Sequence, residues 1–436
     1  MATATITRRD TAHPSLWTRT AFRNEDWFDQ DQLEEMRTYF HPIKRIRLAR
    51  SLLSSGALVA FALAGGGRWA ADLVGGWWGF QLLAVIFFLN ILMTAVTTPF
   101  SAWVTLSYDK RHGLSNQTPG SFATDVVKEI VISTILETVI FVAVYAAIRS
   151  FDLWWFIGWA AFMALQVVLI FVYPILILPR FNKFTPLESG ELRERIEEVA
   201  RLANTEIEGI YVMDASKRSR RGNAFVAGFG KTKRVVLFDT ILEMPTESIA
   251  NVVAHEIGHY RLHHTLLSLP FVGVLVFASL LFTDAVASSA TLLDWVDAPT
   301  LGDPASLPLF LIAFGLAWTA LGLAQAWWSR YQERAADLEA LELLGNPTNF
   351  MAIWPRLVTL NKAELEPSWW ARLNHGHPEV SERMAFGVRW AELNGVPAER
   401  PPRTRLDDPL ASVRPDEPAA SPALPDPDVP TVVEVE

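Results

Sequence analysis

Two histidines four residues apart carry the clearest chemical signal in the sequence. Residues 255–259 read His-Glu-Ile-Gly-His. On an α-helix, side chains four positions apart leave the same face one turn apart, so His255 and His259 can both bind one tetrahedral zinc ion. Glu256 is then placed as general base for a zinc-bound water. The pattern predicts zinc-dependent hydrolysis, although two surface histidines on a charged helix would read the same.

A catalytic zinc site also needs a third protein ligand and an open position. Glu333 and Asp337 are again four residues apart, in a segment that we expect to be helical. We assign Glu333 as the third ligand of one zinc ion per chain. Asp337 would accept a hydrogen bond from a ligand imidazole. By spacing alone, both residues fit a solvated helix face with Glu–Arg pairs equally well.

The helix that carries the histidines has a start signal at Pro245-Thr246-Glu247. We expect it to run through His259 toward Leu266. In such a helix His263 shares the face of His259, whereas His264 points elsewhere. His263 could therefore compete for the metal, but it is too far along the helix from His255 to join the site comfortably, and the favoured role of both residues is that of polar residues at the membrane boundary.

The rest of segment 179–264 reads as a small mixed domain. Glu188–Arg201 has apolar residues at helical spacing. Ile210–Met213 and Arg234–Phe238 are apolar and β-branched, which is typical of short strands. We therefore expect a zincin-like catalytic domain with a small β-sheet.

The chain around this domain is strongly apolar. Of its 436 residues, 50% are hydrophobic. Six stretches are long enough to cross a membrane, and we expect six spans, at Leu52–Ala70, Trp77–Val96, Ile130–Ile148, Leu153–Leu178, Leu266–Ala287 and Leu307–Trp328. A buried core helix is the alternative for any single stretch. The fold class expected is mainly α, a polytopic membrane protein.

Loop charge predicts the orientation. The N-terminal segment and the loop at 100–128 are rich in Lys and Arg, whereas the loop around Asp294 and Asp297 lacks them. The positive-inside rule then places both termini and the catalytic domain in the cytoplasm.

The domains expected are a cytoplasmic segment (1–50), four spans with the cytoplasmic loop 100–128 (51–178), the zinc domain (179–264), two spans (265–328), a third-ligand and substrate-contact segment (329–400) and a disordered, Pro-rich acidic tail (401–436).

Composition narrows the classes of function. The chain has no cysteine, which excludes disulfides, thiolate nucleophiles and Cys-based zinc sites. The net charge of −9 gives no support for a nucleic-acid partner. The partners expected are the lipid bilayer and a peptide or protein substrate.

Several motifs together resemble the type I CAAX prenyl endopeptidases, a family of integral-membrane zinc proteases. The resemblance extends from about Trp27 to Trp390 and rests on segments 108–118, 179–187, 223–225 with 235–240, 255–264, 329–337 and 377–383. It implies a helical barrel in the membrane that encloses a water-filled chamber capped by the zinc domain. Family members with seven spans begin with one that we do not find in residues 1–50.

The resemblance also implies roles for further residues. It favours Glu333 as the third zinc ligand over the alternative of a solvated helix face. It implies that His377 and Arg383 contact the substrate and the developing oxyanion, and that a strand region binds the substrate backbone, at Asn223, Ala224 and Phe225. The family's substrates are prenylated C-terminal peptides, so a membrane-associated or lipidated substrate is implied. Two alternatives stay open: a heat-shock-type quality-control zinc protease, and a catalytically silent membrane binding protein or transporter.

Overall fold

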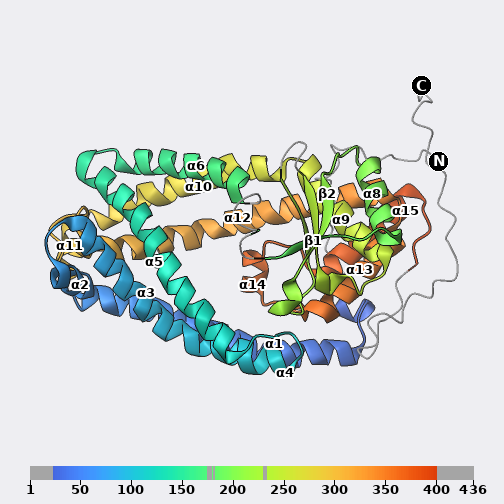
Figure 1. The fold of residues 1–436 in the computed structure, drawn as a ribbon, viewed down its shortest axis with the longest axis horizontal. Coiled ribbons are helices and arrows are strands. Elements are labelled where there is room, and N and C mark those ends of the chain that lie inside the picture. Colours follow the sequence, from blue (N-terminus) through green and yellow to red (C-terminus); the bar gives the residue numbers. More distant parts are fainter. Residues whose placement is uncertain (1–22, 174–178, 180–181, 229–232, 400–436) are drawn as a thin grey trace.

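The computed structural model describes residues 23–399, apart from 174–178, 180–181 and 229–232 (Figure 1). Within this part, six helices are long and apolar enough to cross a membrane. They are α1 (Gln30–Leu63), α3 (Trp78–Ala102, continued by a π-helical turn and the short α4 to Arg111), α5 (Pro119–Ser150), α6 (Trp154–Val172), α10 (His264–Ala287) and α12 (Leu307–Leu344). Six spans are therefore confirmed. The predicted disordered tail lies outside the described residues.

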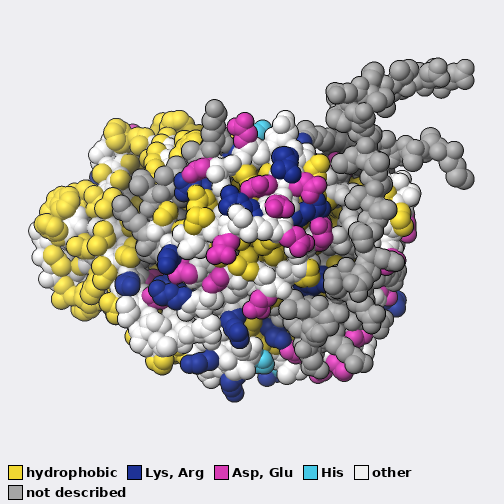
Figure 2. All heavy atoms as spheres, turned by 45° about the vertical axis from the view of Figure 1, so that its right-hand side comes forward, with side chains coloured by type: hydrophobic (Ala, Val, Ile, Leu, Met, Phe, Trp, Pro, Cys, Tyr) yellow, Lys and Arg dark blue, Asp and Glu magenta, His cyan; other side chains and the backbone are white. Residues whose placement is uncertain are grey.

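The spans expose their apolar surface. In the most apolar 18-residue stretch of α1 only 6% of the residues are buried, and in the corresponding stretch of α6 none is buried. Figure 2 shows hydrophobic side chains gathered at one end of the molecule and charged side chains over the other. A buried core helix would hide such a surface, because exposed apolar area is unfavourable in water. These helices face lipid, as expected of a multi-pass membrane protein.

The spans close into a ring. Each span contacts the next in the order α1, α3, α5, α6, α10 and α12. The last of them, α12, contacts α1. At each end, α1 and α12 contribute to one buried cluster: Leu33 and Leu338 belong to the first, and Ala62 and Leu309 to the second. The predicted helical barrel is thus closed by six spans.

The first span differs from its expected limits. We predicted Leu52–Ala70, but α1 begins much earlier, at Gln30, where Asp29 and Gln32 form a capping box. It ends at Leu63, because Gly65 adopts a left-handed conformation with φ 69°. The polar N-terminal half of α1 is helical because its apolar side chains pack against α12 and the helical segments that follow it, which a count of hydropathy does not reveal.

Short helices close the end of the barrel that lies away from the β-sheet (Figure 1). They include α2 (Gly66–Val74) and α11 (Ala290–Trp295). Arg68 pairs with Asp303 at 2.8 Å and donates to the backbone carbonyl of Asp297. The zinc domain therefore sits at the opposite end of the spans.

The zinc domain is a small mixed α/β unit. Its elements are β1 (Phe184–Pro186), α8 (Glu191–Leu202), β2 (Gly209–Met213), β3 (Ala224–Ala227), β4 (Arg234–Phe238) and α9 (Thr246–Arg261). The strand order is β1-β2-β4-β3, with β2 and β4 parallel and the outer pairs antiparallel. Ile196, Leu237 and Ile257 are fully buried in the core between the sheet and the helices. The expected β-sheet is confirmed.

Three further helices complete this end of the molecule: α13 (Pro347–Asn361), α14 (Trp369–Asn374) and α15 (Val380–Asn394). Phe350 and Phe386, from α13 and α15, are buried in one cluster with residues of α1 and α12. This cluster fixes α15 beside the C-terminal half of α12, which carries Glu333.

Candidate metal centre

The metal centre forms where α9 packs against α12. Gly258 lies at the contact: a Cβ added there would come within 3.2 Å of the Ala336 carbonyl oxygen and of Glu339 Cβ. Glycine therefore allows the two helices to approach closely. Arg261 of α9 also pairs with Glu339 of α12. The close approach brings the predicted ligands of the two helices together.

The three predicted ligands converge. His255 Nε2 and His259 Nε2 are 3.1 Å apart, and each is 3.4 Å from an oxygen of Glu333. One ligand atom from each residue lies within 4.8 Å of the others. Ligand atoms about 2.0–2.1 Å from a tetrahedral zinc ion are about 3.3 Å from one another. The spacing and the donor types therefore fit zinc.

Charge at this site favours a cation. Burial alone would lower the pKa of the His255 imidazole, but the carboxylates of Asp337 and Glu333 outweigh it and raise that pKa to about 10. The same negative field attracts a divalent metal ion. Burial raises the pKa of the neighbouring Glu256 carboxyl, which makes it a stronger base.

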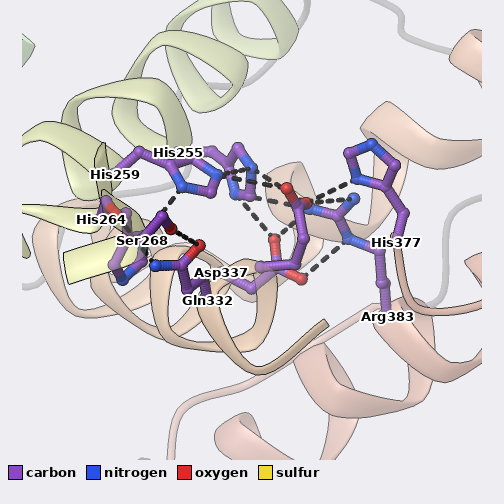
Figure 3. Close-up of polar contacts among 9 residues, drawn as sticks. His255, His259, His264, Ser268, Gln332, Asp337, His377 and Arg383 are labelled. Atoms are coloured by element: carbon purple, nitrogen blue, oxygen red, sulfur yellow. Dashed lines mark hydrogen bonds and ion pairs between the residues drawn. The ribbon is translucent and has the colours of Figure 1, made fainter. Parts of the chain in front are cut away.

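His255 is supported by an ion-paired network (Figure 3). Its Nδ1 lies 2.9 Å from an oxygen of Asp337, which is completely buried. Arg383 of α15 donates from Nε to the other Asp337 oxygen at 2.8 Å. The guanidinium stacks over the Trp354 ring at 3.7 Å and lies 3.5 Å from Glu333. Asp337 is thus placed to fix the orientation of the His255 ring.

His259 is supported from the membrane side, where our expectation was wrong. The predicted continuous helix toward Leu266 is broken: α9 ends at Arg261, and His263 is left-handed with φ 54°. The break turns the buried His264 back toward the site, so that its Nδ1 lies 2.8 Å from His259 Nδ1. His264 does not point elsewhere, as an unbroken helix would require, whereas His263 is exposed.

His377 lies on the open side of the site. Its side chain is 72% exposed, and its Nδ1 is 2.9 Å from Glu333. Figure 3 shows it across from the two histidines of α9, near Arg383. Its exposure leaves the imidazole accessible to a substrate, whereas the Arg383 side chain is only 7% exposed.

The segment Asn223-Ala224-Phe225 leads into β3, an edge strand of the sheet. Among the described residues β3 pairs with β4 alone, with Ala224 opposite Leu237 and Phe225 opposite Val236. Asn223 is exposed and accepts a backbone hydrogen bond from Phe238 at 2.9 Å. β3 also contacts α9. An edge strand beside the metal helix is a place where an extended peptide can add.

Sequence reasoning did not identify every residue of the site. Trp354 under Arg383 and Gln332 beside His264 have ordinary helical contexts, with no spacing that marks them. The membrane loop is also tied to the zinc domain: Asn116 donates from its backbone to Arg218 at 3.1 Å. Segment 108–118 was singled out only through the family resemblance.

Comparisons with known proteins agree with the geometry. Residues 19–183 match the model for the CAAX prenyl protease N-terminal region with five membrane helices, and residues 186–390 match Peptidase family M48. Within the first range, the described residues form the four spans α1, α3, α5 and α6 and the short α2. Together the two models cover almost the stretch over which the resemblance was expected.

Relatives extend these matches. The chain is 32% identical over 294 residues to a CAAX prenyl protease 1 homolog of Oryza sativa subsp. japonica, covering 66% of this chain and 68% of that protein. It is 38% identical over 203 residues to a CAAX prenyl protease 1 homolog of Arabidopsis thaliana, covering 45% of this chain and 48% of that protein.

A solved structure has the same fold. The crystal structure of S. mikatae Ste24p matches with a TM-score of 0.76 at 22% identity, over 87% of this chain and 95% of that one. None of these matches favours the quality-control protease or the catalytically silent membrane protein. The chain therefore belongs to peptidase family M48, together with the CAAX prenyl protease 1 homologues, and is a multi-pass membrane protease.

Proposed function

We propose that this protein is a zinc-dependent endopeptidase in which His255, His259 and Glu333 hold the metal. The observation that carries the proposal is the meeting of two imidazole nitrogens and a carboxylate at mutual distances of 3.1–3.4 Å. Zinc bound there would supply Lewis acidity to the reacting carbonyl and lower the pKa of water. One zinc ion per chain satisfies this ligand set.

The residues around the metal have separate tasks. Glu256 takes a proton from the attacking water and later passes it to the leaving amine, and its raised pKa suits both steps. Asp337 holds the His255 ring in the orientation and tautomer that a ligand requires. Together they give a peptide hydrolase with the general base next to the first ligand.

Two further side chains would act on the substrate carbonyl. The exposed His377 can donate to the oxyanion that develops during attack. Arg383 donates a hydrogen bond to Asp337. Its positive charge is also close to the reaction centre, because Nη1 lies 3.5 Å from the Glu333 carboxylate. We propose that both stabilise the transition state, His377 by contact and Arg383 by its nearby charge.

The substrate would bind as an extended strand. In the described part of the chain, β3 is an edge strand with one side open to β-addition, and Asn223 directly precedes it. Asn223, Ala224 and Phe225 would then align a peptide along α9. Backbone pairing of this kind places a scissile bond with little demand on the sequence of the substrate.

The substrate class proposed is a lipid-modified C-terminal peptide of the CAAX type. Two observations support it: the relatives named CAAX prenyl protease 1 homologues, and a metal centre beside α10 and α12, both of which enter the membrane. A lipid anchor would keep a peptide at this depth. A farnesylated C-terminal peptide and the same peptide without the lipid test this. We expect cleavage of the farnesylated peptide, and equal cleavage of both would remove the lipid requirement.

Replacement of the general base tests the mechanism. In Glu256→Gln we expect hydrolysis to fall by at least about 10²–10⁴-fold while zinc remains bound, since general base catalysis contributes that much. The matched control is Glu247→Gln on the same helix, where a partly exposed Glu247 pairs with Arg195 far from the ligands. Retained turnover in Glu256→Gln would exclude this role.

The orientation proposed places both termini and the zinc domain in the cytoplasm. The structure puts α11 at the opposite end from the zinc domain, so Trp295 and Glu399 should lie on different sides of the membrane. Because the chain has no cysteine, single Trp295→Cys and Glu399→Cys variants can be labelled cleanly. A membrane-impermeant thiol reagent should label only Trp295→Cys in intact cells. The reverse result would invert the orientation.

A further inference from the structure

We propose that His264, the first residue of the span α10, positions the metal ligand His259 by accepting a hydrogen bond from its Nδ1–H group. The two Nδ1 atoms are 2.8 Å apart, and the His264 side chain is buried. This inference rests on the proposed function, because it takes His259 to be a zinc ligand. It makes a membrane span part of the support of the metal centre.

The positions of the ring protons on His259 and His264 follow from which nitrogen of His259 faces the other ligands. His259 Nε2 points to the other ligands, 3.1 Å from His255 Nε2 and 3.4 Å from Glu333. A metal-binding imidazole nitrogen carries no proton, so the neutral ring carries its proton on Nδ1. That proton faces His264, which must accept it on Nδ1 and carry its own proton on Nε2.

The backbone is shaped to allow this contact. In an unbroken helix a residue five positions after His259 is rotated by about 500°, which is about 140° away from its face. Here α9 ends at Arg261, and His263 adopts φ 54° and ψ 34° before α10 begins. A left-handed residue other than glycine is uncommon and is strained unless its surroundings hold it. The strained turn is what brings His264 back to His259.

A second set of hydrogen bonds holds that turn in place (Figure 3). The buried Gln332 donates from Nε2 to the backbone carbonyl of His264 at 3.0 Å. Ser268 donates to Gln332 Oε1 at 3.0 Å, and Trp328 donates to Ser268 at 3.1 Å. Gln332 directly precedes the ligand Glu333 in α12. The same helix therefore supplies one ligand and fixes the support of another.

The usual support of a ligand histidine is a carboxylate, a backbone carbonyl or water. His255 has the carboxylate of Asp337. His259 instead has an imidazole that enters the site from a membrane span. The zinc affinity should thus depend on the acceptor at position 264, although this residue lies outside the zinc-binding motif.

Two substitutions of similar shape isolate the acceptor. His264→Asn places an amide oxygen near the position of Nδ1, whereas His264→Leu places a methyl group there. We measure the zinc dissociation constant of the full chain in detergent by competition with a chelator. His264→Leu should weaken zinc binding by about 10–100-fold, and His264→Asn should recover most of this loss. The exposed neighbour gives the control, since His263→Asn suits a left-handed position and should bind zinc like the wild type.

The outcomes separate this inference from the proposed function. A wild-type chain that binds no zinc would remove both. Zinc bound by the wild type, with His264→Leu binding it equally tightly, would overturn the positioning role alone. Should the Leu variant not fold, nuclear magnetic resonance of the zinc-loaded, ¹⁵N-histidine-labelled wild type decides: we expect protons on His259 Nδ1 and His264 Nε2, and a proton on His264 Nδ1 overturns the inference.

Discussion

The two histidines of the metal centre are supported by different chemistry. On one side, His255 contacts the completely buried Asp337, which is bound by the Arg383 guanidinium. On the other, His259 contacts the imidazole of His264 at the start of a membrane span. The first support is an ion pair between α12 and α15. The second is a pair of imidazoles that depends on the turn between two helices.

The difference matters for what a substitution would cost. When one partner of a buried ion pair is removed, the protein is strongly destabilised, because the other charge stays buried and unpaired. A hydrogen bond between two imidazoles leaves no such charge behind. Loss of the Asp337 side should therefore destabilise the protein, whereas loss of the His264 side should mainly weaken metal binding.

Removal of Glu333, the proposed ligand that both histidines face, should have the largest effect. Glu333 faces His255 and His259 at 3.4 Å each. We expect Glu333→Gln to lose stoichiometric zinc and peptidase activity. Both losses should exceed the roughly 100-fold that is typical when a residue hydrogen-bonded to a ligand is replaced. Metal analysis and a peptide-cleavage assay measure this. Glu342→Gln, at an exposed position of the same helix, is the control. Stoichiometric zinc in Glu333→Gln would contradict the ligand assignment.

Loss of the ion-paired support comes next. In Asp337→Ala the buried Arg383 is left without its main partner, and we expect a loss of about 3–5 kcal/mol of stability. The melting temperature of the metal-free protein measures it, so that lost zinc does not contribute. Glu382→Ala, which breaks the partly exposed pair with Arg334, should cost no more than about 1 kcal/mol. Equal melting temperatures for both variants would show that the Asp337 network is not a stabilising pair.

The two sides also differ in how far the sequence predicts them. Glu333 and Asp337 are four residues apart in one uninterrupted helix, α12, so helical periodicity alone places them on one face. The same rule places His255 and His259 in α9. The zinc motif, the six apolar spans and the short strands of the sheet depend on such local patterns, and they could be predicted.

Contacts that depend on a break or on tertiary packing could not. No glycine or proline marks the turn at His263. Helical periodicity therefore predicted a continuous helix, in which His264 points away from the metal centre. The helical start at Gln30 was hidden for a similar reason: the polar half of α1 is stabilised by packing against α12 and α13, which are far away in the sequence. Trp354 under Arg383 is another contact of this kind.

A conservative change within the ion-paired side should have a smaller effect than its removal. Arg383→Lys keeps the positive charge but loses the planar fork that donates twice to Asp337 and stacks on Trp354. We expect a loss of about 1.5–3 kcal/mol, the value of a hydrogen bond to a charged group, with zinc retained. Thermal unfolding and metal analysis measure both. A Lys variant as unstable as Asp337→Ala would mean that geometry matters more than charge there.

The smallest effect concerns the turn that carries the other support. His263 is left-handed, with φ 54°. A β-branched residue strongly disfavours this conformation, whereas glycine adopts it freely. We expect His263→Val to lower stability by about 1–2 kcal/mol and His263→Gly to lower it little or not at all, with melting temperature as the measurement.

Zinc affinity then tells whether the turn acts through His264. A chain that relieves the strain of His263→Val by opening the turn would move His264 away from His259 and weaken zinc binding, while the contact of His255 with Asp337 stays as it is. The exposed side chain at position 263 is not among the ligands, so a difference between Val and Gly must come from the backbone. Equal affinities in the two variants would mean that the contact of His264 with His259 survives without the left-handed turn.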